Sequence, residues 1–214
     1  MPMAEILDRL RAAYGKPQER PPRPALDELV LTILSQNTSD LNSERAYARM
    51  RERFPTWADV RDAPEAELVE ALRPGGLAVQ KAPRIQAVLR EIEPLDLDRL
   101  GEEPAGEAMR RLVALPGVGP KTASCVLLFS LGVPVMPVDT HIHRIALRVG
   151  LVPDGTTADA AHALLTGMTP ARRMLEAHLL LIRHGRTTCT ARRPRCEECV
   201  LLDLCDYGRA AVTT

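Results

Sequence analysis

The sequence predicts an all-α protein, and three observations support this. Apolar residues recur at spacings of three and four along most of the chain, which is the period of a helix packed on one face. No segment shows the strict apolar and polar alternation of a half-buried strand. Proline and glycine interrupt the helical pattern at short intervals, so the connections are short. With 214 residues, the chain is long enough for one large domain or two small ones.

The expected helices are identified by their apolar spacing and by the residues at their ends. The first helix has an apolar face made of Ile6, Leu7, Leu10 and Tyr14. Gly15 and Pro17 end it, because neither residue favours continuing a helix. The proline-stiffened connection QERPPRPALD then leads to an apolar helix over 26–34, which ends in the polar run SQNTSD.

The remaining helices follow with short breaks. Thr56 and Asp59 form the spacing of a capping box, and Pro64 suits the first turn of the next helix. Gly75 and Gly76 predict a turn in RPGGLAVQKAP. The expected helices cover residues 42–53, 56–62, 64–72, 81–93, 107–114, 121–131, 140–149, 157–167 and 171–183.

The charge balance limits the possible partners. The chain has 28 basic and 28 acidic residues, whereas nucleic-acid-binding domains are usually basic overall. A polyanionic partner would therefore need a local basic surface. The stretch RHGRTTCTARRPR, residues 183–195, offers five arginines and no acid, although on charge alone a solvated loop has the same pattern.

The hydropathy predicts no membrane segment. No stretch is apolar for long enough to span a bilayer. The first fifteen residues read as an amphipathic helix with acidic residues, unlike a signal or transit peptide. We therefore expect a cytoplasmic protein with no membrane partner. Because nothing in the sequence indicates oligomerisation, we expect a monomer.

The string LPGVGPKTAS, residues 115–124, places a tight turn between two helical patterns. Gly117 and Gly119 can adopt the positive φ angles that such a turn demands, and they leave the backbone open to a ligand. The N–H groups at the start of the second helix would then form an anion site that suits a DNA phosphate. An ordinary helix turn is the alternative when the two glycines are considered alone.

Lys121, directly after this turn, is one of only three lysines among 28 basic residues. Because the chain otherwise uses arginine for positive charge, a lysine at this position indicates a role that a guanidinium cannot fill. A lysine amine can lose its proton and attack carbon, whereas arginine stays protonated. A simple phosphate contact is the alternative.

Asp139, in VDTHIHR, lies where a helix N-cap is expected, and a cap can also serve as a catalytic carboxylate.

Four cysteines follow the pattern C-x6-C-x2-C-x5-C within seventeen residues near the C-terminus. In a cytoplasmic protein this density favours a metal site over disulfides. Four thiolates fit zinc or an iron–sulfur cluster. Cys125 stands apart from the four and is expected to be a small core residue.

Taken in order, the strings ILSQNTSD, GGLAVQKA, LPGVGPKTA and PVDTHIHR and the terminal cysteines resemble the helix-hairpin-helix DNA glycosylase superfamily, most closely its endonuclease III branch. The resemblance implies two helical domains with a DNA-binding cleft between them. One is a six-helix barrel or bundle over residues 22–134, with the helix-hairpin-helix at about 107–132. The other combines residues 1–21 and 135–214 and contains a cluster loop over 189–205. In this family pattern Lys121 faces Asp139 across the cleft.

The resemblance also implies the activity. It predicts a bifunctional DNA glycosylase and abasic-site lyase of base excision repair, acting on double-stranded DNA that contains damaged bases or abasic sites. The enzyme would remove oxidised pyrimidines and cleave the strand by β-elimination, through a Schiff base on Lys121 with help from Asp139. Such an enzyme would be associated with the nucleoid. Relatives that only excise the base lack a lysine at this position.

Further site residues are carried over from the same family motifs. The cysteines would hold a [4Fe–4S] cluster: Cys189, Cys196, Cys199 and Cys205. The DNA contacts would come from Gly117, Val118, Gly119, Gln36, Asn37, Leu77, His141, Arg186, Arg192 and Arg193. Among these, Asn37 and Leu77 are the candidates that fill the gap left by a flipped nucleotide.

Two other functions remain open at this point. A mismatch-directed thymine or uracil glycosylase of the same superfamily would share these motifs. A non-catalytic DNA-binding scaffold would keep the hairpin and the cluster, although the presence of both Lys121 and Asp139 argues against it.

Overall fold

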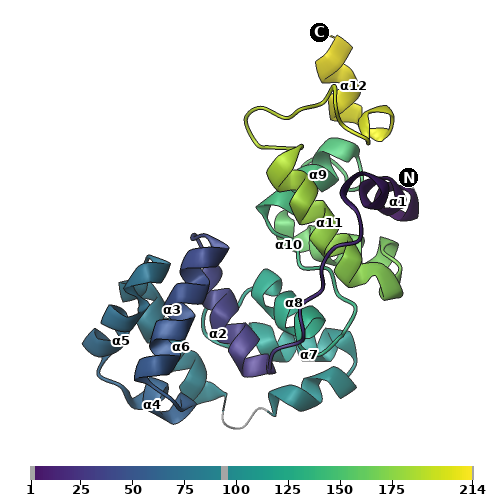
Figure 1. The fold of residues 1–214 in the computed structure, drawn as a ribbon. Helices are drawn as coiled ribbons and strands as arrows, with labels where there is room; N and C mark the ends of the chain where they lie inside the picture. The colour runs from purple at the N-terminus through teal and green to yellow at the C-terminus, as the bar shows by residue number, and fades with distance from the viewer. Residues whose placement is uncertain (1–2, 93–95, 214) are drawn as a thin grey trace. The chain divides into compact units, whose positions relative to one another are not determined.

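The computed structural model describes residues 3–92 and 96–213, and these residues contain helices and no strand. The chain divides into two compact units. Unit 1 combines Met1–Pro21 with Pro134–Thr214, and unit 2 is Pro22–Val133. Within the described ranges, no helix is both long and apolar enough to cross a membrane. The all-α prediction is confirmed (Figure 1).

Unit 2 is built around one apolar helix, α2. Its helices are α2 (Ala25–Ser35), α3 (Asp40–Arg53), α4 (Trp57–Asp62), α5 (Glu65–Leu72), η1 (Arg73–Gly75), α6 (Ala78–Glu91), η2 (Leu97–Glu102), α7 (Ala105–Val113) and α8 (Pro120–Phe129). Leu29, Ile33 and Leu34 of α2 are fully buried. Because every residue from Leu29 to Leu34 is buried, and these residues cover all sides of the helix, α2 packs against α3, α6 and α8 at once.

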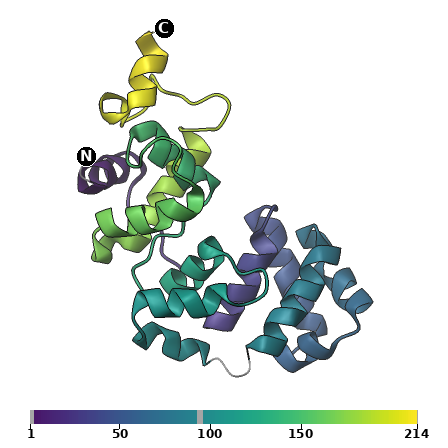
Figure 2. The same cartoon turned by 180° about the vertical axis from the view of Figure 1, so that it is seen from behind.

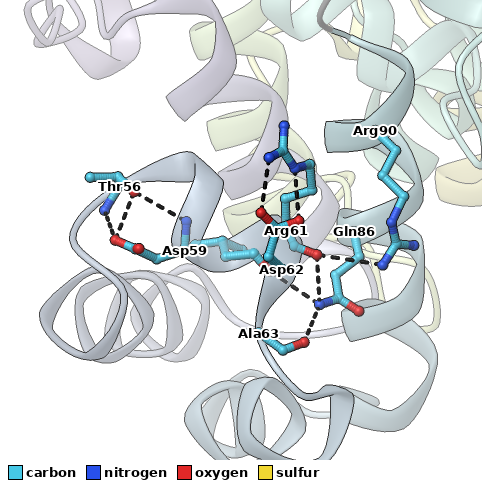
Figure 3. Close-up of polar contacts among 8 residues, drawn as sticks. Thr56, Asp59, Arg61, Asp62, Ala63, Gln86 and Arg90 are labelled. Carbon is cyan, nitrogen blue, oxygen red and sulfur yellow. Dashed lines mark hydrogen bonds and ion pairs between the residues drawn. The ribbon is translucent and has the colours of Figure 1, made fainter.

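The short helix α4 illustrates how local sequence sets the boundaries. The Thr56 hydroxyl accepts from the Asp59 N–H, and the Asp59 carboxylate accepts from the Thr56 N–H, so the predicted capping box is present (Figure 3). At the other end, the buried amide of Gln86 donates to the carbonyl oxygens of Val60, Arg61 and Ala63. A six-residue helix is too short to be stable alone, so these contacts and its packing on α6 hold it in place.

Unit 1 combines both ends of the chain. Its helices are α1 (Met3–Tyr14), α9 (Thr140–Val149), α10 (Ala158–Met168), η3 (Ala171–Arg173), α11 (Met174–Thr187), η4 (Leu202–Leu204) and α12 (Asp206–Thr213). Helix α11 packs against α1 and α9, and α9 also packs against α12 (Figures 1 and 2). Tyr14 of α1 bonds to the His184 ring of α11 at 2.8 Å, which links the N-terminal helix to the C-terminal half.

The structure corrects some of the expected boundaries. Helix α6 starts at Ala78 rather than at residue 81, because the glycine turn ends at Leu77, and Pro83 lies inside the helix. The expected end of this helix at residue 93 and the first two residues of the N-terminal segment lie outside the described residues. The helices η2, η4 and α12 were not predicted from the sequence; each has eight residues or fewer, which is too short for apolar spacing to stand out.

Candidate active site and cluster site

The glycine hairpin joins α7 to α8 in unit 2. Gly117 has φ +69°, and a Cβ there would lie 2.5 Å from Cδ and Nε of Arg84, so only glycine fits. Gly119 has φ −92° and no neighbour within 4 Å of an added Cβ. The expectation that both glycines need a positive φ is therefore wrong for Gly119, which adopts extended backbone before the helix.

The hairpin leaves the start of α8 available to a ligand. Val118 is 3% exposed, and its N–H donates to the Leu115 carbonyl at 3.1 Å, which closes the turn. Pro120 is the first residue of α8 and has no N–H. The N–H groups of Lys121 and Thr122 lie in the first helical turn, where no carbonyl of the same helix can accept from them. This is the backbone arrangement of an anion site.

Lys121 is half-buried at the second position of α8, and the acid that it influences is Glu28 on α2. Burial raises the pKa of Glu28, while the positive charges of Arg23 and Lys121 and a hydrogen bond from Thr32 act in the opposite direction. The Thr32 hydroxyl donates to the Glu28 carboxylate at 3.3 Å. A carboxylate one helix away therefore shares the electrostatic environment of the candidate nucleophile.

Gln36 connects this region to the end of α2. Its Nε2 donates to Thr122 Oγ1 at 3.4 Å, and its Oε1 accepts from Arg84 Nη1 at 2.9 Å. Asn37 and Leu77, the two candidate gap-filling residues, are both exposed, and Leu77 is 45% exposed. They are also the two non-glycine residues with positive φ in the described parts of the chain, at 56° and 52°. Neither feature was used to predict them.

Asp139 is the N-cap of α9 in unit 1. Its Oδ1 accepts from the N–H groups of His141 at 3.0 Å and Ile142 at 2.8 Å, so the predicted cap is present. Oδ2 takes part in neither cap bond. His141 is half-buried, and its Nδ1 accepts from Arg144 Nη2 at 3.1 Å. This bond fixes the orientation of the ring next to the aspartate.

The segment before Asp139 is held by three side chains. The Thr166 hydroxyl accepts from the Met136 N–H at 2.9 Å. His162 Nδ1 bonds to the Met136 carbonyl at 2.8 Å, and His178 Nδ1 bonds to the Pro137 carbonyl at 3.1 Å. Both histidines are buried, so their role is structural. They fix the extended backbone from which Asp139 emerges.

The four terminal cysteines line one cavity in unit 1, together with His184, Leu201 and Tyr207. All four are free thiols in the structure. In the described parts of the chain, no three His, Cys, Asp or Glu side chains gather around a single metal ion. The thiols instead stand around the cavity wall. Four thiol donors lining one cavity are the donor set of an iron–sulfur cluster. Cys125, on α8 in unit 2, is buried 97%.

Hydrogen bonds to sulfur complete this cavity. The N–H groups of Leu201 and Gly208 donate to Cys199 Sγ at 3.4 Å and to Cys205 Sγ at 3.2 Å. His184 Nε2 lies 3.8 Å from Cys199 Sγ. Burial lowers the pKa of His184 to about 4, and the charge of Arg144 adds to this effect. The ring is therefore neutral at physiological pH.

Arginines of α9 shape the loop that carries the first cysteine. Arg144 donates to the carbonyl oxygens of Gly185 and Cys189, at 2.9 Å and 2.8 Å. Arg148 donates to the Thr190 carbonyl at 2.7 Å and to the Ala191 carbonyl at 2.9 Å. Neither arginine was predicted as a functional residue, because the only signal for them in the sequence is their position on the polar side of α9. The predicted DNA-binding arginines are exposed on the surface: Arg186, Arg192 and Arg193.

Comparison with known proteins agrees with the resemblance inferred from the motifs. Residues 30–170 match the family model of the HhH-GPD superfamily base excision DNA repair proteins, and residues 189–205 match the iron-sulfur binding domain of endonuclease III. Endonuclease III of Treponema pallidum (strain Nichols) is 38% identical over 208 residues, which cover 94% of this chain and 92% of the relative.

Two solved structures are similar over almost the whole chain. A trapped endonuclease III–DNA covalent intermediate has a TM-score of 0.83 and 28% identity, covering 99% of each chain. A non-covalent endonuclease III–DNA complex has a TM-score of 0.84 and 28% identity, covering 100% of each chain. The matched domain indicates a [4Fe–4S] cluster in this chain. Cys189, Cys196, Cys199 and Cys205 all lie within the matched residues and line the cavity described above. The chain belongs to the HhH-GPD superfamily of base excision DNA repair proteins and is a DNA glycosylase.

Proposed function

We propose that this enzyme is a bifunctional glycosylase and abasic-site lyase that removes oxidised pyrimidines from duplex DNA. The observation that carries the proposal is the position of Lys121, a half-buried amine in the first turn of α8, directly after the glycine hairpin. A phosphate bound at the hairpin N–H groups would place the adjacent nucleotide near this amine. The likeness to a trapped endonuclease III–DNA covalent intermediate supports an enzyme that bonds to its substrate.

The proposed reaction has two steps. The unprotonated Nζ of Lys121 attacks C1′ of the flipped nucleotide, and the glycosidic C1′–N bond breaks. The departing base leaves with the bonding electrons and takes up a proton. Positive charge grows on the sugar during this step, and the Asp139 carboxylate stabilises it. The amine adduct at C1′ loses a proton from nitrogen, and its C1′–O4′ bond then breaks, with O4′ taking up a proton, to give a Schiff base. The Schiff base acidifies C2′, so loss of a C2′ proton expels the 3′ phosphate and cuts the strand.

Other residues would bind and open the duplex. The exposed side chains of Asn37 and Leu77 are proposed to fill the gap left by the flipped nucleotide. Arg186, Arg192 and Arg193 are proposed to contact phosphates, with Gln36 and His141 close to the lesion. When bound, the [4Fe–4S] cluster would fix the shape of the loop that carries two of these arginines. Because the substrate is chromosomal DNA, we expect the protein at the nucleoid.

Borohydride trapping tests the proposal. Duplexes containing an oxidised pyrimidine, a thymine opposite guanine or a plain abasic site are incubated with enzyme and sodium borohydride, which reduces a Schiff base to a stable amine. We expect a covalent adduct with the oxidised pyrimidine and with the abasic site. Lys121→Gln should give no adduct, whereas Lys16→Gln, which changes an exposed lysine, should react as the wild type does.

Three results would contradict the proposal in different ways. An adduct with Lys121→Gln would exclude this lysine as the nucleophile. An adduct with mismatched thymine but not with the oxidised pyrimidine would assign the enzyme to mismatch repair. No adduct with any duplex, from protein that binds DNA, would indicate a non-catalytic scaffold.

A further inference from the structure

Lys81 on α6 is a lysine that the proposed reaction does not use. Its side chain is 2% exposed, although lysine is almost never fully buried unless it is paired. The ammonium donates to the Leu34 carbonyl at 2.6 Å and to the Gly75 carbonyl at 2.9 Å. Burial lowers the pKa of Lys81. Leu34 lies before α3 in the sequence, and Gly75 lies after α5. The ammonium therefore joins two segments that are far apart in the sequence.

The two segments joined by Lys81 are those that carry the strained residues of unit 2. Leu34 lies three positions before Asn37, and Gly75 lies two positions before Leu77. Asn37 and Leu77 are the non-glycine residues with positive φ in the parts of the chain that the structure describes. Such backbone is unfavourable for residues with a side chain, above all for a leucine, and persists only where the surroundings hold it.

A lysine suits this position better than arginine does. Its compact ammonium has three N–H groups that point in different directions, and it can bond to carbonyls of two segments at once. Hydrogen bonds from a charged donor are stronger than those between neutral groups. The planar fork of arginine would need more space, and Lys81 is fully enclosed.

Helix α6 also fixes the hairpin relative to these two segments. Arg84, one turn after Lys81, donates to Gln36 Oε1 at 2.9 Å. The side chain of Arg84 packs against Gly117 and occupies the space that a side chain at position 117 would need. Gln36 in turn donates to Thr122 in the first turn of α8. One face of α6 therefore contacts the Asn37 segment, the Leu77 segment and the turn before Lys121.

We propose that Lys81 is a positioning residue for DNA opening, which holds the Asn37 and Leu77 segments in the conformation that fills the gap left by the flipped nucleotide. The inference rests on the proposed function, in which these residues enter the duplex. It adds to that function a residue that holds the gap-filling segments in place. Lys81 itself touches neither the DNA nor the reacting atoms.

The test compares substrates that do and do not require opening. Lys81→Met keeps the length and the apolar stem but removes the bonds to both carbonyls. We expect it to slow base excision from a duplex with an oxidised pyrimidine by about 100-fold, the size of effect expected when a group is misplaced by about 1 Å. Schiff base trapping on an abasic site in single-stranded DNA should change less than about 3-fold, because no base pair is opened. Lys16→Met is the matched control.

A fluorescent base opposite the lesion provides a second measurement. 2-Aminopurine brightens when it loses its stacking partner, so its fluorescence reports opening without any chemical step. We expect wild-type enzyme to raise this signal and Lys81→Met to raise it far less at equal occupancy of the DNA. In a double-mutant cycle with Leu77→Gly, the second substitution should add little to the first, because both act on the same segment.

The outcomes separate this inference from the proposed function. Equal losses on duplex and single-stranded substrates, or full additivity with Leu77→Gly, would overturn the role of Lys81. If the wild type forms no adduct on any substrate, the proposed reaction fails, while the opening signal still tests Lys81. If Lys81→Met does not fold, Lys81→Gln, which keeps one amide donor, should show the same contrast between substrates at a smaller size. The absence of this contrast would also overturn the inference.

Discussion

The hairpin and the cluster loop are held in place in different ways. In the hairpin, Leu115 and Val118 are buried between two helices, and a backbone bond closes the turn. In the cluster loop, residues 189–205, the short helix η4 is the only helix, and the rest consists of bends, turns and irregular backbone. Its backbone carbonyls are bound by arginine side chains of α9, and its cysteines surround a cavity.

This difference indicates how each region depends on the rest of the protein. The hairpin takes its shape from the apolar core of unit 2, so its conformation follows from packing alone. The cluster loop buries few apolar side chains, and such loops unfold locally at low free-energy cost unless a ligand holds them. We therefore expect the two regions to respond separately to substitution.

Cys199→Ser should produce the largest difference between the responses of the cluster loop and the hairpin. A hydroxyl is a poor ligand for iron, so the cluster should be lost, and the free energy of cluster binding would be lost from the loop with it. We expect purified protein with almost no iron or sulfide. Hydrogen exchange should become fast over residues 189–205 and stay slow in α2 and α8. The matched control is Cys125→Ala, at the buried cysteine outside the cavity, which should keep the iron. Faster exchange of α2 and α8 in Cys199→Ser would show that the two regions are coupled.

The next effect in size should be that of Gly117→Ala on the hairpin. Alanine at φ +69° is strained by about 1–2 kcal/mol, and its Cβ would force Arg84 to move. We expect lower stability by at least this amount and weaker binding to duplex DNA, with normal iron content. Thermal unfolding and fluorescence anisotropy check this. Gly119→Ala, at φ −92° with open space around the Cβ, should be near neutral in stability. Equal losses in stability for the two variants would show that strain at Gly117 is not the cause.

The sequence predicted the features that are encoded over a few neighbouring residues. The Thr56 and Asp59 capping box, the Asp139 cap and the end of α1 at Gly15 each depend on contacts within about four positions. The family motifs identified the hairpin lysine and the cluster cysteines in the same way. Such local patterns can be identified in a sequence without knowledge of the tertiary structure.

The features that the sequence did not reveal depend on contacts between distant segments. Lys81 bonds to a carbonyl 47 positions away, and Arg144 bonds to one 45 positions away. A carbonyl exists at every residue, so the acceptor leaves no trace in the sequence. The sequence marks Lys81 only by the scarcity of lysine and by its place in the string GGLAVQKA, and neither feature identifies the two carbonyls that it binds. The positive φ angles of Asn37 and Leu77 were equally hidden, because neither residue type requires them.

A smaller effect is expected from Arg148→Lys in the cluster loop. Arg148 donates to the Thr190 and Ala191 carbonyls and lies 4.4 Å above the Tyr207 ring. A lysine ammonium would keep the charge but lose the fork that reaches both carbonyls, at a cost of about 1 kcal/mol per lost bond. We expect cluster loss in the presence of a chelator to become several-fold faster, measured by the decay of visible absorbance. Arg192→Lys, at an exposed arginine, should leave this rate unchanged.

The smallest effect should be a pH-dependent gain in stability from Glu28→Gln near the hairpin. Because burial raises the pKa of Glu28 in the folded state, the folded protein binds a proton more tightly than the unfolded chain does. The wild type therefore loses stability as the pH rises from the pKa of an unfolded glutamate, about 4.3, through the folded pKa. Glutamine resembles the protonated acid, so the melting temperatures of variant and wild type should agree near pH 4 and separate above that window.

A substitution of Lys121 tests the Glu28 effect further, because the charge of Lys121 lowers the pKa of Glu28 whereas burial raises it. In a Lys121→Met background, the Glu28 carboxylate loses an attractive partner, so Glu28→Gln should raise the melting temperature further at neutral pH than in the wild type. Glu91→Gln, at an exposed acid at the end of α6, should change the melting temperature little in either background. If the gain from Glu28→Gln is the same with and without Lys121, the two charges do not interact, and the carboxylate can be excluded as a partner of the nucleophile.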